Sequence, residues 1–232
     1  MDRHPPIAEH GLIGDLHTAA LVGVDGTIDW YCPPDFDSPS VFAAILDRTR
    51  GGGWRIAPRG GGWTSKQLYF PDTNILITRF LSPDGVGELQ DFMPIASSPA
   101  HPPHSLIRRV LCVRGSVEFE TEFEPRFDYG RQRHEPHLHE RGAIFESPGL
   151  TLALASPRPL ALTGAGARTA FTLSPGKARR SRSCPQSGAR RRHRSTSGRP
   201  ASPSRTPSRT GELGSAGRDT RGAGARWCTA RR

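Results

Sequence analysis

The sequence predicts an all-β fold: an antiparallel β-sandwich with one short helix, followed by a disordered basic tail. Three observations support this prediction. Short runs of β-prone residues recur along the chain, turn-forming residues separate them at regular intervals, and the composition changes abruptly at residue 177. We therefore expect one folded domain over residues 1–176 and a tail rich in Arg, Ser, Pro and Gly over residues 177–232.

The charge of the chain is concentrated in its tail. From Lys177 to Arg232 there are 16 Lys and Arg residues against 2 Asp and Glu, whereas residues 1–176 hold 16 against 20. The tail also contains one Leu, one Trp and no Val, Ile, Met, Phe or Tyr. Such a segment cannot bury enough apolar surface to offset its ordering entropy, so we expect it to be disordered.

The expected strands begin with a hairpin at Asp25-Gly26, where apolar runs flank a dipeptide typical of tight turns. In the run 116–124, apolar residues alternate with four glutamates, which predicts a strand with one buried and one solvated face. Further strands are expected at 54–57, 74–80, 86–92, 105–113, 143–147, 150–156 and 168–174.

The short helix is expected over residues 39–47. Ser38 can cap its N-terminus, Pro39 suits its first turn, and three apolar residues fall on one face. No apolar run is long enough to span a membrane, and the first ten residues lack the apolar core of a signal peptide.

Cysteine usage predicts free thiols and a cytoplasmic location. Cys32, Cys112, Cys184 and Cys228 are scattered and form no CxxC pair, which suits a reducing compartment. Cys112, within an apolar run, is expected to behave as a small buried hydrophobe.

Acidic residues and one histidine gather near the N-terminus. Two carboxylates there could serve glycoside hydrolysis or hold a metal ion. Asp25 is expected to serve the turn, and Asp37 or Ser38 the helix cap. For the others, both a structural and a functional role stay open, and the candidate substrate-loop residues are Asp15, His17, Asp29 and Trp30.

A second candidate cluster is the sequence HEPHLHE at 134–140. In a strand, His137 and His139 would share a face and could take a metal ion, but no third ligand accompanies them and Pro136 favours a solvated surface loop. The glycine-rich stretches match neither a dinucleotide-binding nor a phosphate-binding pattern. We therefore predict neither a metal site nor a cofactor.

Several motifs in the expected order resemble one known family. PPIAEHGLIGDLHTAALVGVDGTIDWYCPPDFDSPSVFAAILD, YFPDTNILITRF, DFMPI and RRVLCVRGSVEFETEFEPRFDYGR are similar to the trehalase-like N-terminal domain of glycoside hydrolase family 15, which includes bacterial and archaeal glucoamylase and trehalase relatives. The resemblance covers about residues 5–175.

This resemblance implies a β-sandwich followed, in full-length members, by a linker and an (α/α)6 barrel. That barrel carries two glutamates, one of which protonates the leaving oxygen while the other activates water. Roughly 400 further residues would be needed for the barrel. We therefore expect that this chain is truncated before the barrel, holds no catalytic residue and is inactive alone.

Two classes of function follow from the sequence. The chain is either the non-catalytic domain of a family 15 protein acting on trehalose or a related α-glucoside, or a free-standing binding module. Such a module would bind sugar through Trp30, Trp54 and Trp63, or nucleic acid through the basic tail. Exposed tryptophans would favour a sugar-binding module, and buried ones the non-catalytic domain.

The tail itself has two interpretations. It is either a native arm that binds nucleic acid or an out-of-frame translation product of a G+C-rich gene, and its abrupt start favours the second. If the domain is cut at residue 176, an unpaired strand edge should make the chain prone to aggregation.

Overall fold

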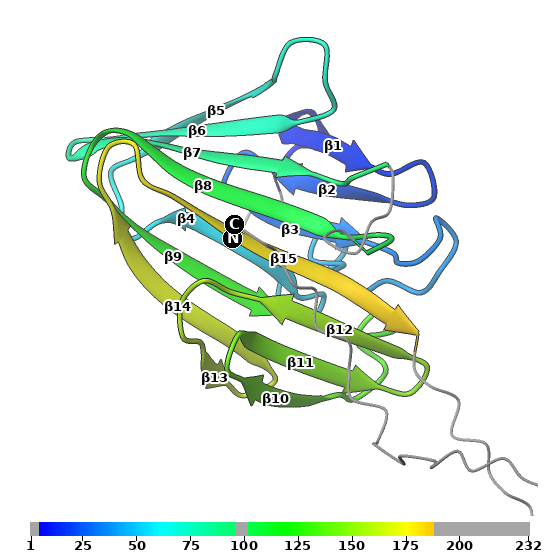
Figure 1. Ribbon diagram of the computed structural model, residues 1–232. Helices are drawn as coiled ribbons and strands as arrows, with labels where there is room; N and C mark the ends of the chain where they lie inside the picture. Colours follow the sequence, from blue (N-terminus) through cyan, green and yellow to red (C-terminus); the bar gives the residue numbers. More distant parts are fainter. Residues whose placement is uncertain (1–4, 96–101, 188–232) are drawn as a thin grey trace, which may run out of the picture. The chain divides into compact units, whose positions relative to one another are not determined.

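The structure, a computed structural model, describes residues 5–95 and 102–187, which form one β-sandwich. All strand pairs are antiparallel (Figure 1). The elements are η1 (Ile7–Glu9), β1 (His10–Gly14), β2 (Ala19–Gly23), β3 (Thr27–Tyr31), β4 (Gly53–Pro58), β5 (Thr64–Tyr69), β6 (Leu76–Ser82), β7 (Gly85–Phe92), β8 (Leu106–Gly115), β9 (Val117–Glu124), β10 (Glu135–His139), β11 (Gly142–Ser147), β12 (Leu150–Ala155), β13 (Ala161–Thr163), β14 (Gly166–Leu173) and β15 (Ala178–Ser187).

Two sheets make up the sandwich. The first has the order β1-β2-β3-β4-β9-β14-β13, and the second has the order β10-β11-β12-β15-β8-β7-β6-β5. The chain passes from the second sheet to the first twice, between β8 and β9 and between β12 and β13, and at the first of these turns Gly115 has a φ of 71°. The predicted antiparallel β-sandwich is therefore confirmed.

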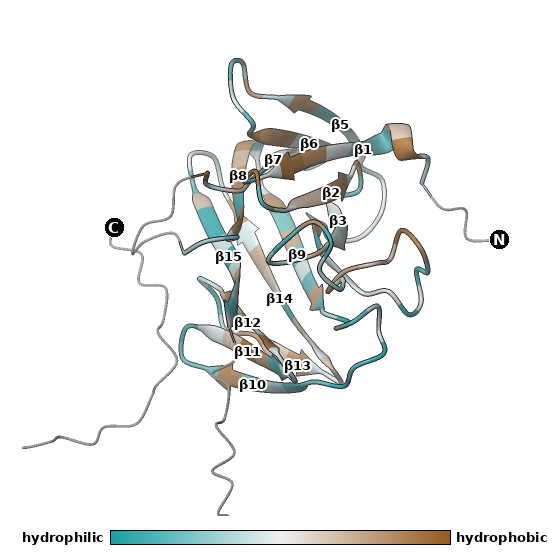
Figure 2. Ribbon diagram, turned by 90° about the vertical axis from the view of Figure 1, so that its right-hand side faces the viewer, coloured by the Kyte–Doolittle hydropathy of each residue, from teal (hydrophilic) through white to brown (hydrophobic). Residues whose placement is uncertain are grey.

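The core between the sheets is built from aromatic and aliphatic side chains. Trp54 is fully buried, and its ring meets that of Phe123 edge-on at 5.4 Å, while Phe123 also contacts Phe145 at 4.9 Å. Hydrophobic and hydrophilic residues alternate along β9 (Figure 2). Its glutamates face outward, and Glu118 pairs with Arg59 at 3.0 Å, as expected for the solvated face of a sheet.

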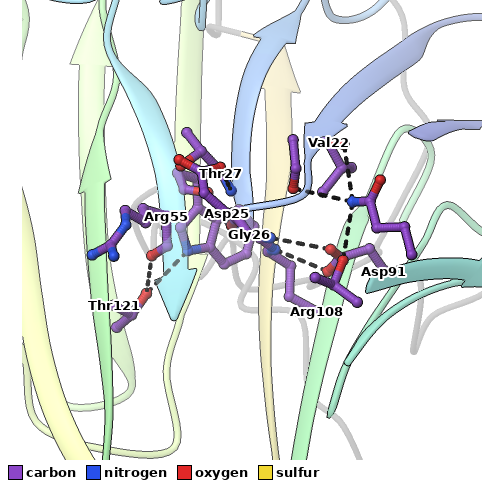
Figure 3. Close-up of polar contacts among 12 residues, drawn as sticks. Val22, Asp25, Gly26, Thr27, Arg55, Asp91, Arg108 and Thr121 are labelled. Carbon is purple, nitrogen blue, oxygen red and sulfur yellow. Dashed lines mark hydrogen bonds and ion pairs between the residues drawn. The ribbon is translucent and has the colours of Figure 1, made fainter. Parts of the chain in front are cut away.

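A buried ion pair also lies between the sheets. Arg108 on β8 donates to both carboxylate oxygens of Asp91 on β7, at 2.9 and 3.1 Å, and both side chains are fully buried (Figure 3). The same guanidinium donates to the carbonyl of Gly26, in the turn between β2 and β3, at 2.7 Å and to the carbonyl of Trp54 on β4 of the first sheet. Arg108 therefore links the two sheets through hydrogen bonds as well as through packing.

The expected hairpin at Asp25-Gly26 is confirmed. Gly26 has a φ of 80°, which favours glycine, and the backbone N–H of Thr27 donates to the Asp25 carboxylate at 3.0 Å. Asp25 therefore serves the turn, as predicted.

The expected helix over 39–47 is wrong. The backbones of Val41 and Phe42 hydrogen-bond with Tyr31, at 2.9 and 3.0 Å, which requires an extended chain, and the following residues form turns. Burying Phe42 in the core outweighs the local helical pattern. In the described residues the one helical element is the short 3-10 turn η1, and no helix there is long and apolar enough to cross a membrane.

The predicted boundary at residue 176 is also wrong. Ala178–Ser187 forms β15, which pairs with β8 on one side and β12 on the other (Figure 1). Because β15 pairs with both β8 and β12, these strands have no unpaired edge here, and the reason for expecting aggregation no longer holds. The rest of the predicted tail, residues 188–232, lies outside the described residues.

Pro185 occupies an unusual position in this inner strand. Pairing with β8 ends at Ser183, whereas pairing with β12 continues to the end of β15. Pro185 therefore lies where the strand has a ladder partner on one side, which is where a residue without an N–H is tolerated.

The cysteines in the described part of the chain lie buried and form no disulfide. Cys112 is 2% exposed, as expected for a small buried hydrophobe. Burial raises the pKa of Cys32 to about 11, which keeps that thiol protonated near neutral pH.

Candidate functional site

Loops from both sheets gather at one end of the sandwich. Ala20 pairs with Tyr31, so the turn after β1 lies beside the loop after β3, and Gly53 pairs with Glu124, so that loop lies beside the loop after β9. We call this region the loop end; it comprises residues 15–18, 32–52, 93–95 with 102–105, 125–134 and 148–149.

Asp15 lies at the loop end and is 3% exposed. Its Oδ1 accepts the backbone N–H groups of His17 and Thr18, at 3.1 and 3.0 Å, and its Oδ2 lies 2.9 Å from Nδ1 of His104. The carboxylate therefore holds its own turn together and orients an imidazole that is 89 residues away in sequence.

His104 is the residue that sequence reasoning missed. The hydroxyl of Tyr31 donates to the His104 carbonyl at 2.7 Å, and burial raises the pKa of Tyr31 well above its usual range, so the hydroxyl keeps its proton. His104 has a φ of 56°, in the left-handed region that non-glycine residues rarely adopt. No local pattern near His104 could have predicted that its partner is Asp15, which lies in the turn after β1.

His17 is exposed and lies against His104. The two rings meet edge-on, with centroids 5.5 Å apart. The structure thus brings Asp15 and His17 together, because both side chains contact His104. No group of three or more His, Cys, Asp or Glu side chains in the described ranges is placed to hold a metal ion.

Asp29 lies in a different environment. The pairing of β2 with β3 skips Asp29, since Leu21 faces Trp30 and Val22 faces Ile28, so Asp29 is the extra residue of a β-bulge. Its Oδ2 lies 2.7 Å from Nε2 of His10, and its Oδ1 is buried without a hydrogen-bond partner in the described residues.

Burial raises the pKa of Asp29, and the His10 interaction offsets this only in part. Burial of the His10 ring lowers its pKa, but the hydrogen bond and charge of Asp29, together with backbone interactions at Pro6 and Ile7, outweigh that effect and leave the pKa above the usual value of 6.5. Nδ1 of His10 also lies 3.0 Å from the carbonyl of Pro6. The pair therefore ties the N-terminal segment to β3.

Of the three tryptophans proposed for sugar stacking, Trp30 and Trp63 are half-buried and Trp54 is fully buried. The ring of Trp30 lies 6.3 Å from that of Tyr129, over which the Arg131 guanidinium sits at 5.4 Å. Trp54 is fully buried, and Trp63 packs on the core with its ring 5.2 Å from that of Phe80.

The histidines at 137 and 139 lie on the edge strand β10, so the expectation of a surface loop is wrong. Pro136 faces Phe145 within the β10–β11 pair, and an edge strand accommodates proline because its outer N–H groups need no ladder partner.

Two hollows lie side by side at the loop end and share Pro34, Gly149 and Leu150; together we call them the loop-end groove. The first has a volume of about 240 Å³ and is also lined by Phe127 and Asp128. The second has a volume of about 340 Å³ and is lined by Pro34, Pro103, His104, Gly149, Leu150 and Pro185.

Backbone strain concentrates around this groove. Among the described residues, the non-glycine residues with positive φ are Leu16, Asp72, His104, Asp128 and Tyr129. All except Asp72 belong to the loop end, and two of them line the groove. Strained backbone of this kind persists where the surroundings hold it, and it often marks functional sites.

Comparison with known proteins gives a consistent answer. A family model described as trehalase-like, N-terminal, matches residues 2–175. A trehalase from Thermoplasma volcanium is 32% identical over 162 residues, which cover 69% of this chain and 26% of that protein. A trehalase from Mycolicibacterium smegmatis is 36% identical over 142 residues, which cover 55% of this chain and 21% of that protein.

The matched part of the chain spans between a fifth and about a quarter of the length of these relatives. The family match covers all four motifs quoted above and every element of the sandwich up to the end of β14. The chain therefore belongs to the trehalase-like N-terminal domain family.

Proposed function

We propose that this chain is the non-catalytic N-terminal domain of a glycoside hydrolase family 15 protein, whose catalytic (α/α)6 barrel would lie outside the segment that this chain matches. The parent would hydrolyse trehalose or a related α-glucoside. The observation that carries this proposal is that relatives named trehalase match the chain over only 21% to 26% of their own length. Most of each relative lies beyond the part that this chain resembles.

The chemistry of the buried carboxylates supports a non-catalytic role. Glycoside hydrolysis requires two carboxyl groups that face the scissile bond across an open site. In the described residues, each buried carboxylate is within hydrogen-bonding distance of a basic side chain. The pairs are Asp15 with His104, Asp29 with His10, Glu88 with Arg79, and Asp91 with Arg108.

The natural partner in this proposal is the barrel of the full-length parent, and no cofactor is needed for its chemistry. A cytoplasmic location is part of the proposal and is based on the cysteine usage of the sequence. The alternative of a sugar-binding module based on three tryptophans is weakened because Trp54 and Trp63 pack against the core. The alternative of nucleic-acid binding through a basic tail is also weakened, because residues 178–187 of the predicted tail form strand β15 of the sandwich.

The first experiment is a glucose-release assay. The purified chain should release no glucose from trehalose, maltose or short α-glucans, while the full-length Mycolicibacterium smegmatis trehalase serves as the positive control. Turnover by this chain that co-purifies with the folded protein would overturn the non-catalytic assignment.

A second experiment tests the assignment to a parent enzyme. Residues 2–187 of this chain, which include β15, should replace the corresponding N-terminal segment of the Mycolicibacterium smegmatis trehalase with retention of trehalose hydrolysis, whereas deleting that segment should abolish it. A soluble chimera with no activity would contradict the proposed role.

A further inference from the structure

We propose that the loop-end groove binds an α-glucoside and that His104, held by Asp15, contacts the sugar through Nε2. The choice of sugar rests on the proposed function, but the site is inferred from the groove and its polar groups. The groove would make this domain a contributor to substrate binding without any part in bond cleavage.

The Asp15 carboxylate determines what His104 offers to the groove. Because Nδ1 lies 2.9 Å from a carboxylate oxygen, the proton of a neutral ring resides on Nδ1. Nε2 is then a hydrogen-bond acceptor, and it has no hydrogen-bond partner elsewhere in the described residues. A sugar hydroxyl is the complementary donor.

The backbone of His104 is fixed on both sides of the imidazole. Tyr31 donates to its carbonyl, and the hydroxyl of Ser105 donates to the carbonyl of Pro102 at 2.6 Å. Asp15 is itself anchored by two backbone N–H groups. The acceptor therefore occupies one position before a ligand arrives, which lowers the entropy cost of binding.

The surface of the groove suits a neutral, two-faced ligand. Prolines and Leu150 provide apolar surface, while His104 lines one hollow and Asp128 lines the other. The Asp128 carboxylate accepts a hydrogen bond from Arg131 at 2.7 Å, so the groove carries little net charge. Sugar rings combine apolar C–H faces with hydroxyl groups and match such a lining.

The shape of the groove favours two rings over one. The hollows of about 240 and 340 Å³ meet at Pro34, Gly149 and Leu150, so one ring can occupy each hollow while the linkage crosses the shared wall. An anionic ligand is disfavoured because the side chains that line the two hollows include a carboxylate and no Lys or Arg.

The test is a titration of the full chain with trehalose and, separately, with maltose, monitored by amide chemical shifts and by calorimetry. We expect saturable binding, with the largest shifts at loop-end residues around 104 and 149. His104→Asn removes the imidazole and suits the left-handed backbone, because Asn adopts positive φ more readily than most residues. It should weaken binding about threefold to tenfold, the effect of losing one hydrogen bond.

The matched control is His137→Asn, which removes an exposed imidazole on the edge strand β10 and should leave the affinity unchanged. Amide spectra of both variants establish that they are folded. The proposal is overturned if trehalose and maltose give no saturable shifts, or if His104→Asn binds as tightly as the unaltered chain. Either result would leave the glucose assay and the chimera unaffected, so the proposed function is tested separately.

Discussion

The Arg108 guanidinium and the Asp91 carboxylate are joined by two hydrogen bonds, and neither side chain is exposed. The same guanidinium also donates to the backbone carbonyls of Gly26 and Trp54 on the opposite side of the sandwich. A buried charge that loses its partner is costly, because neither water nor another group replaces it. Arg108 therefore ties the second sheet to backbone groups of the first, and Asp91 balances its buried charge.

Asp91→Ala should lower the free energy of unfolding by about 3–5 kcal/mol, since it leaves the Arg108 charge buried and uncompensated. Urea unfolding followed by tryptophan fluorescence measures this. The control is Glu118→Ala, which removes the acid of the exposed Arg59–Glu118 pair and should change stability far less, because solvent screens that pair. Equal effects of the two substitutions would contradict the inter-sheet role of Arg108.

The His10–Asp29 pair predicts a pH dependence. Because the pKa of His10 is raised in the folded state, its stabilisation is complete below about pH 6.5 and is lost as the pH rises through the folded-state pKa. The raised pKa of Asp29 acts in the same direction, since the folded state again binds protons more tightly. The stability advantage of the unaltered chain over His10→Gln should therefore shrink as the pH increases.

Unfolding curves measured at several pH values from below 6.5 to above the folded-state pKa of His10 test the prediction, and His137→Gln provides the reference for an exposed imidazole. A gap between the unaltered chain and His10→Gln that widens with rising pH would show that the sign is wrong.

Asp15→Asn should invert the tautomer of His104. The amide oxygen can keep both backbone N–H bonds of the turn, so the amide N–H group then faces Nδ1 and moves the ring proton to Nε2. Nitrogen-15 chemical shifts of the ring report this directly, with the exposed ring of His137 as an internal reference. An unchanged tautomer would mean that Asp15 does not orient the imidazole.

Gly87→Ala should destabilise the domain by about 1–3 kcal/mol, through overpacking. A Cβ at this position would lie 2.4 Å from Cζ of Phe119, a ring that is fully buried. Gly61→Ala is the control, because a Cβ there meets nothing within 4 Å. It should be neutral or slightly stabilising. Similar unfolding midpoints for the two variants would argue against close packing of Phe119 on β7.

Ending the chain after residue 176 should prevent cooperative folding, whereas ending it after residue 187 should not. The shorter version lacks β15 and leaves the edges of β8 and β12 unpaired, which favours aggregation. Size-exclusion chromatography and urea unfolding distinguish the two outcomes. A monomeric, cooperatively folded 1–176 chain would show that β15 is dispensable.

Local patterns were sufficient to predict most of the sandwich. The Asp25-Gly26 turn and the alternating run of β9 depend on neighbouring residues, and both were predicted correctly. The β-bulge at Asp29 could not be predicted in this way, because its carboxylate is directed toward His10 on another strand. The same holds for the pairing of Asp15 with His104.

β15 was missed for a different reason. Its residues include arginines and serines and no large apolar side chain, so composition alone predicts disorder. The strand is nevertheless paired with a neighbour on each side, and backbone hydrogen bonds do not depend on side-chain polarity. Tertiary pairing therefore outweighed composition over residues 178–187.

The position of β15 also has a consequence for synthesis. β8 and β12 are neighbours only through this strand, so a nascent chain that has reached residue 177 carries two half-sheets, β5–β8 and β10–β12, that cannot yet join. Contacts between distant parts of a chain slow folding, and incomplete sheets expose surface that chaperones recognise. The second sheet can therefore be completed only after residue 187 has emerged from the ribosomal exit tunnel.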